Sequence, residues 1–391
     1  FSGRGLDQWA DHHRVRRRAP GTRLNGQDPA GSPSFSSRSL PRCASWPTRL
    51  SLRLDQHRED DKTASVSPTK PRSNPAQDRE QGGNPIPGSF FLTGSVEPET
   101  YGPTYPLTGR SARVLLRPMN RREQIGNGAE PTWIDHLRDG EILRTGTGGR
   151  RSGLDLLATS GFPGAAPKGN HRAWLRAYAA TIAERSVDER RDPERVGRLI
   201  RVLSELESQA VPDETVWRAA DINRETLHSY RDMLARTHVV TPLPAWETNR
   251  LKRITSYPKR QLVDTALALA LAGIDVPELM ADPTLAGRYV ESFVVAQLRP
   301  DVDAAGGHLS HLRTRGGDHE VDIVIDIGGR LVALDVKAGV NPTPRDTRHL
   351  AWLRNWIGDR LDAAVVLHRG ESTFELVDGV WAVPISSLWS N

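Results

Sequence analysis

Two aspartates and one lysine, close together near the C-terminal end, are the side chains of this chain with the most definite chemistry. Asp322 lies in the alternating run EVDIVIDI, and Asp335 and Lys337 lie in the run RLVALDVK that follows it. The Gly328-Gly329 pair between the runs predicts a tight β-hairpin turn, which sets Asp322 opposite Asp335. Facing carboxylates repel each other unless a cation, a proton or a salt-bridge partner lies between them. The spacing therefore predicts a polar site that can hold a metal ion beside a lysine.

The register of this hairpin is set by the alternation of its side chains. Successive residues of a strand point to opposite faces, so one face of the hairpin is wholly apolar and must be buried. The second face carries the two aspartates, with Lys337 opposite Glu320, and a slip of one residue would place the carboxylates in the core. One alternative stays open, in which this second face is solvated and holds an ordinary ion pair between aspartate and lysine. The apolar face comprises Val321, Ile323, Ile325, Ile327, Val332, Leu334 and Val336.

Two segments on either side of the hairpin add to the predicted site. LAGRYVESFVVAQLR, residues 285–299, has the apolar spacing of an amphipathic helix and carries Glu291. A carboxylate at that position can complete the ligand shell of a cation. LDAAVVLHRG, residues 361–370, has the pattern of a buried strand and is expected to extend the sheet beyond the hairpin.

A glutamate on a helix, an aspartate on a strand and D-x-K on the next strand resemble the arrangement of the restriction-endonuclease-like PD-(D/E)XK nucleases. The resemblance implies that Glu291, Asp322 and Asp335 bind Mg²⁺, and that Lys337 positions or polarises the attacking water. A hard cation with several oxygen ligands suits such a set. The chain departs from the pattern at Val321, where this superfamily often has a proline.

A longer stretch, residues 89–389, resembles a group of prokaryotic AAA-type ATP-binding proteins that carry a nuclease-like domain at the C-terminus. The resemblance implies ATP binding at the level of the family, with the polar side chains of Thr93 and Ser95 near the γ-phosphate. The matching pieces occur in the expected order, and they are SFFLTGS at 89–95, LTGRSARVLLRPM at 107–119, GFPGA at 161–165, SYPKRQLVDTALALALAG at 256–273 and DGVWAVPISSLW at 378–389.

The ATPase part of that pattern is broken. A P-loop needs G-x-x-x-x-G-K-[ST] after a strand, because backbone amides and a lysine must hold the phosphates, and this motif occurs nowhere in the 391 residues. We therefore expect no ATPase activity from this chain. Residues 1–84 are rich in Ser, Pro, Arg and Gln, lack helix or strand periodicity and are expected to be disordered. One hypothesis is that they are translated in a different reading frame from an intact nucleotide-binding core.

The net charge of +5 does not mark the whole chain as a nucleic-acid binder. Residues 1–50 hold nine arginines against three aspartates, so the rest of the chain is close to neutral. Any contact with DNA must then come from a local basic patch rather than from the overall field.

Cysteine and apolar content predict a cytoplasmic protein. The lone cysteine, Cys43, allows no internal disulfide and no cysteine metal site. The longest apolar segment, LVDTALALALAGI, is too short to cross a bilayer, so no membrane partner is expected. The histidines at 319, 349 and 368 show no metal-ligand spacing and are expected at the surface.

The middle of the chain is helical in pattern. HRAWLRAYAATIAERSV and PERVGRLIRVLSELESQA have the spacing of packing helices, and the following segment, 213–246, looks like a winged helix-turn-helix. Asp213 is expected to cap its first helix, 226–234 to form the second helix, and THVVTPLP to form the wing. A lid or packing element is the alternative. In a DNA reader the second helix would face the major groove with Asn223, Arg224, Thr226, His228 and Arg231.

Together these patterns predict an α/β multidomain protein. It would comprise a disordered or frame-disrupted tail, 1–84, a remnant of a P-loop-like AAA-type core with a connector, 85–169, a helical winged helix-turn-helix module, 170–250, and a restriction-endonuclease-like α/β domain, 251–391. The expected function is that of a DNA-associated or regulatory member of the ATP-binding family, without ATPase activity. A Mg²⁺-dependent nuclease acting at the hairpin and a non-catalytic interaction module are the alternatives.

Overall fold

The structure, a computed structural model, describes residues 115–144, 149–165, 171–185, 192–247, 257–314 and 317–390. These residues belong to one compact unit, Gly94–Asn391. The predicted tail and the predicted ATP contacts Thr93 and Ser95 lie outside the described residues. The predicted α/β class is confirmed, because helices surround one mixed six-stranded sheet.

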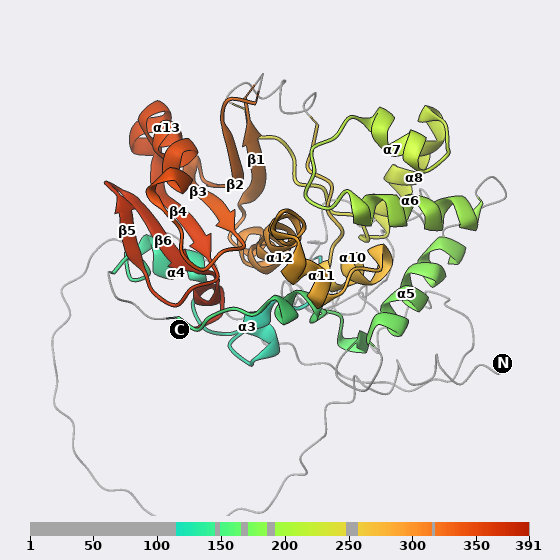
Figure 1. Cartoon of the computed structure of the whole chain (residues 1–391), viewed down its shortest axis with the longest axis horizontal. Coiled ribbons are helices and arrows are strands. Elements are labelled where there is room, and N and C mark those ends of the chain that lie inside the picture. Colours follow the sequence, from blue (N-terminus) through green and yellow to red (C-terminus); the bar gives the residue numbers. More distant parts are fainter. Residues whose placement is uncertain are drawn as a thin grey trace, which may run out of the picture. The chain divides into compact units, whose positions relative to one another are not determined.

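The sheet carries the predicted hairpin near one edge. Its strand order is β1-β2-β3-β4-β6-β5 (Figure 1), with parallel pairing between β3 and β4 and between β4 and β6. The strand expected at 361–370 is confirmed as β4, which pairs with the second strand of the hairpin. The strands are β1 (His308–Arg313), β2 (Glu320–Ile327), β3 (Arg330–Lys337), β4 (Leu361–His368), β5 (Phe374–Val377) and β6 (Val380–Pro384).

Helices bury both faces of this sheet. The long helix α12 (Pro283–Ala304) packs on one face, where Ile323 and Leu334 belong to the larger apolar core. Helix α13 (Arg348–Ile357), which connects β3 to β4, packs on the other face over Val324 and Ala333 (Figure 1). Strands buried on both faces read as nearly continuous apolar runs, as β3 and β4 do.

Three helices of the described part begin at aspartate caps. Asp264, Asp275 and Asp282 accept backbone N–H groups at the starts of α10, α11 and α12, and Gly273 ends α10 at φ 81°. No helix in the described part of the chain is both long and apolar enough to cross a membrane. The further α-helices are α3 (Arg121–Gln124), α4 (Trp133–Arg138), α5 (His171–Arg185), α6 (Pro193–Glu205), α7 (Asp213–Ala219), α8 (Arg224–Arg236), α10 (Thr265–Ala272) and α11 (Val276–Ala281). Short 3-10 helices are η2 (Leu154–Ala158), η3 (Pro163–Ala165), η4 (Pro344–Thr347), η5 (Gly358–Arg360) and η6 (Ile385–Leu388).

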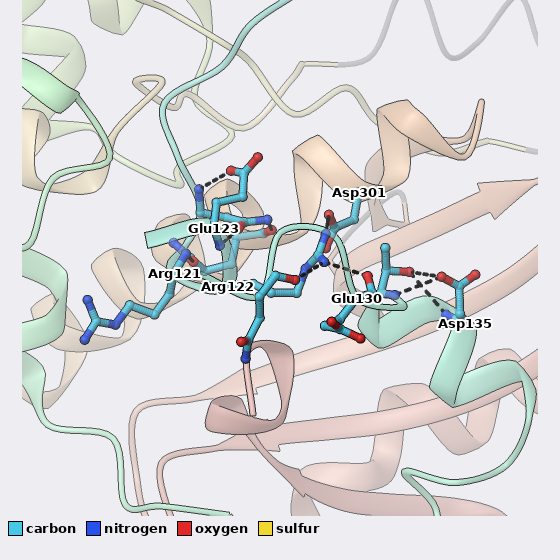
Figure 2. A network of polar contacts seen from close by, with 10 residues as sticks. Arg121, Arg122, Glu123, Glu130, Asp135 and Asp301 are labelled. Atoms are coloured by element: carbon cyan, nitrogen blue, oxygen red, sulfur yellow. Dashed lines mark hydrogen bonds and ion pairs between the residues drawn. The ribbon is translucent and has the colours of Figure 1, made fainter. Parts of the chain in front are cut away.

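A buried ion pair fastens the N-terminal described segment to α12. Arg122 lies 2.7 Å from Asp301 and also donates to the backbone carbonyls of Asn127 and Glu130 (Figure 2). Because both charged side chains are largely buried, each satisfies the other and neither is left as an isolated charge. This network holds the C-terminal half of the helix that also carries Glu291.

Candidate functional site

The predicted hairpin register is confirmed. Ile323 pairs with Leu334 and Ile325 with Val332, which continues to Asp322 opposite Asp335. Both glycines of the turn, Gly328 and Gly329, have positive φ, as a two-residue hairpin turn of the mirror-image type requires.

The expected division of the hairpin into a buried and a polar face is only partly right. The apolar face is buried beneath α12, but the second face is also buried, because α13 covers it. Val321 was expected on the α12 side and packs instead with Val324 on the α13 side. The reason is an irregularity in pairing: Ser310 and Leu312 of β1 face Val324 and Val321, so β2 holds one extra residue there and its alternation reverses.

A lysine that the sequence analysis did not single out stands at the centre of the predicted site. The ammonium of Lys259 lies 2.9 Å from Glu291 on α12 and 3.1 Å from Asp322 on β2. A third carboxylate, that of Glu320, lies 3.5 Å away. The helix glutamate and the strand aspartate thus converge as predicted, around an ammonium group.

The segment that carries Lys259 is held in place by its backbone. Lys259 and Leu243 exchange two backbone hydrogen bonds of 2.9 and 3.0 Å, and the N–H of Leu262 donates to the buried carboxylate of Glu207. Next to it, the guanidinium of Arg260 pairs with Asp213. Lys259 itself is 2 % exposed, so its charge is enclosed by the carboxylates rather than by water.

The charges of this cluster shift each other strongly. Burial alone would lower the pKa of Lys259, but the carboxylates of Asp322 and Glu291 outweigh that effect and raise it. Burial raises the pKa of Glu291 well above its usual value, the charge of Asp322 adds to this, and Lys259 opposes it. Burial would likewise raise the pKa of Asp322, yet Lys259 and a hydrogen bond from the Val336 N–H lower it overall. The stable pair is therefore an ammonium at Lys259 and a carboxylate at Asp322.

Asp335 and Lys337 complete the predicted set without joining the ion pair. The carboxylate of Asp335, 3 % exposed, accepts a 3.4 Å hydrogen bond from the N–H of Asp322, so the two aspartates do meet across the hairpin. Burial and then the charge of Asp322 raise the pKa of Asp335 to about 8, so it is largely protonated at neutral pH. Lys337 is half-buried and has Asp346 at 3.9 Å.

The cluster fits a divalent cation in its chemistry but not in its arrangement. The predicted ligands Glu291, Asp322 and Asp335 carry carboxyl groups, which suit Mg²⁺. Two of them, however, already contact the ammonium of Lys259, which leaves no position for a metal ion between them. In the described ranges no three His, Cys, Asp or Glu side chains are grouped as a metal site would require. As they stand, these residues hold a lysine and do not fit the ion.

His311 of β1 is a further residue of this region that the sequence analysis missed. Its Nε2 lies 3.1 Å from the carbonyl oxygen of Tyr257, two residues before Lys259. Burial and then the charge of Lys259 lower its pKa to about 4, so the ring is neutral at physiological pH. A neutral donor suits a position beside an ammonium group.

The predicted helix-turn-helix residues are arranged for packing at several positions. Asn223 caps α8 by accepting the N–H of Thr226, and Arg231 pairs with Asp213 and approaches the ring of His228. The expected cap at Asp213 is wrong, because Pro212 precedes α7 and Asp213 binds Arg231 and Arg260 instead.

The expected second helix and wing differ from the structure in extent. The second helix is longer than 226–234, since α8 spans Arg224–Arg236. The expected wing, THVVTPLP, forms only isolated bridges with the segment around Lys259, at Val240 with Leu262 and at Leu243 with Lys259. Its backbone therefore serves to hold Lys259.

Two family models of unknown function match the chain. Residues 286–388 match a domain of unknown function, DUF4143, and residues 151–278 match another, DUF8612. The first is common in proteins associated with AAA ATPases, which agrees with the expected resemblance at a coarse level; neither match indicates an ATPase or a nuclease family.

Individual proteins add little to these domain matches. No curated protein matches the chain. A crystal structure of protein VC1899 from Vibrio cholerae matches at 13 % identity over 66 % of this chain and 59 % of that one, with a TM-score of 0.20. So low a TM-score supports no conclusion about fold or activity.

Proposed function

We propose that this chain is a DNA-associated or regulatory protein of the AAA-ATPase-associated kind, whose restriction-endonuclease-like domain does not cut. One observation carries the proposal, namely that the ammonium of Lys259 contacts both Glu291 and Asp322 where a nuclease would need a metal ion. A site already neutralised by an internal cation has no open coordination position for the water that such chemistry requires. The domain then serves binding rather than cleavage.

A cleavage assay tests this proposal directly. Purified protein is incubated with supercoiled plasmid and with single-stranded circular DNA, in Mg²⁺, in Mn²⁺ and in EDTA, and nicking is followed on gels. We expect no nicking above that of a preparation carrying Asp335→Ala. Metal-dependent nicking that disappears in both Asp335→Ala and Lys337→Ala would overturn the proposal.

The second candidate is a Mg²⁺-dependent nuclease. Its support is the convergence of Glu291, Asp322 and Asp335 from a helix and two strands, beside the partly exposed Lys337. For this activity Lys259 would have to leave the cluster when metal and DNA bind. Metal-dependent nicking by the wild-type chain is the result that would favour it.

The third candidate is a non-catalytic interaction module that contacts no DNA. A gel-shift assay at low salt separates it from the first candidate, because phosphate contacts strengthen as salt is removed. Binding of a fluorescent ATP analogue is not expected from either, since the P-loop motif is missing from the sequence.

A further inference from the structure

Five aromatic rings from three parts of the chain form a continuous ladder beside the acidic cluster. His319, before β2, stacks on Trp352 of α13 at 4.0 Å with an interplanar angle of 7°. Trp352 stacks on Trp356 at 5.1 Å, and Trp356 meets the edge of Trp246 at 6.0 Å. His349 meets His319 edge-on at 5.7 Å.

The ladder is buried at its Trp246 end, but the next ring along it is exposed. Trp246 is 3 % exposed, whereas Trp356 is 49 % exposed, so Trp356 is open to solvent. Residues 352 and 356 are one helical turn apart, which explains their mutual stacking but not why the outer ring is left in water. A large exposed indole next to a rigid stack is a surface on which another flat ring can pack.

The other end of the ladder, at His349, reaches the acidic cluster. The N–H of Glu320 donates to Nδ1 of His349 at 3.4 Å, and the carboxylate of Glu320 lies 3.5 Å from the ammonium of Lys259. A ligand that lies along the ladder therefore leads toward the hairpin site.

The basic side chains around the ladder favour a negatively charged ligand. Besides burial, the charges of Arg348 and Lys337 are among the causes that lower the pKa of His349, so these two basic side chains lie near the same histidine. The opposing carboxylate of Glu320 is already shared with Lys259 and Arg313. Arg348 is exposed, so its guanidinium can contact a phosphate that approaches from solvent.

From these contacts we infer that α13 and the residues before β2 form a binding surface for single-stranded nucleic acid, with an unpaired base stacked on Trp356 and a phosphate near Arg348. Stacking on aromatic rings beside basic side chains is how single strands bind without sequence preference. A duplex hides its base faces and would gain nothing from the indole. The inference rests on the proposed association with DNA and specifies which form of DNA is bound and where.

Fluorescence anisotropy of a labelled oligo(dT) of about 20 nucleotides, in EDTA and low salt, tests this surface with the full chain. We expect Trp356→Ala to weaken binding about tenfold and Trp356→Phe to retain most of it. Arg348→Ala should weaken binding and lower the salt dependence by about one phosphate contact. The matched control is Trp174→Ala, which removes an equally stacked indole from α5 at a distance from the sheet.

The outcomes separate this inference from the function on which it rests. If the wild-type chain binds oligo(dT) and Trp356→Ala binds equally well, the surface is wrong while association with DNA stands. Equal weakening of duplex binding by Trp356→Ala would also contradict it, because a stacked base is then not the ligand. No binding of either form by the wild-type chain would overturn both. Circular dichroism melting of each variant shows whether a loss of binding comes from unfolding.

Discussion

Replacing Lys259 with methionine asks whether its ammonium is the cation of the acidic cluster. Methionine keeps the length and most of the volume of the side chain and removes only its charge and donors. The substitution deletes hydrogen bonds of 2.9 Å to Glu291 and 3.1 Å to Asp322, both of them in a buried setting. Leaving buried carboxylates without their partner costs roughly 3–5 kcal/mol of folding free energy.

Urea denaturation followed by circular dichroism, at pH 7 in EDTA, measures that loss. A second series with Mg²⁺ or Mn²⁺ measures what a metal ion restores. We expect Lys259→Met to regain stability in divalent ions, by about 2.7 kcal/mol at an ion concentration one hundred times the dissociation constant. The wild-type chain should not respond, because its ammonium occupies the place.

Lys337→Met is the matched control. Lys337 is much nearer in sequence to the aspartates than Lys259 is, but its side chain is 36 % exposed and its nearest carboxylate lies 3.9 Å away. Removing it should cost about 1 kcal/mol or less and should create no response to metal. The reasoning is refuted if Lys259→Met is as stable as the wild type, or if divalent ions stabilise the wild type as much as the variant.

Three further predictions concern the frame around the site. Glu207 is fully buried, and burial raises its pKa to about 8. The folded state therefore binds this proton more tightly than the unfolded state, and the stability of the wild type falls as the pH rises from about 4.5 to 8. In urea titrations, Glu207→Gln should be more stable than the wild type by roughly 2 kcal/mol or more at pH 9 and equally stable near pH 4. Asp213→Ala leaves the 3 % exposed guanidinium of Arg260 without its carboxylate and should lower the free energy of unfolding by about 3 kcal/mol, whereas Glu214→Ala, which removes an exposed ion pair of the same helix, should change it by less than about 1 kcal/mol. Gly329→Ala should cost about 1–2 kcal/mol by the same assay, because its φ of 85° disfavours a side chain although the added Cβ would meet no neighbour.

The hairpin could be predicted from sequence because its signals are local. Two glycines between alternating runs specify a turn, and the turn then fixes which residues pair. The helix with Glu291 and the strand β4 followed from periodicity alone. The side of the sheet on which Val321 packs could not be predicted in this way. It depends on the extra residue in β2, which arises from pairing with β1 and is not visible in the run EVDIVIDI.

Lys259 could not be found in this way. It precedes Glu291 by 32 residues and Asp322 by 63, and it lies in a segment without helix or strand periodicity. Only the tertiary fold brings these groups together. The electrostatic requirement could be predicted from the sequence, because facing aspartates need a cation, a proton or a salt-bridge partner. The hairpin has two of these, an ammonium from Lys259 and a raised pKa at Asp335.

The same lysine also bears on how the two matched regions relate. Lys259 belongs to the region 151–278, and the carboxylates that it contacts belong to the region 286–388. Around it, Ser292 of α12 donates to Glu207, whose carboxylate also accepts the N–H of Leu262. Buried polar contacts of this kind cannot be given up cheaply, because each partner would be left unsatisfied. The acidic cluster is therefore a property of both regions together, and its charge balance depends on the chain that precedes the sheet.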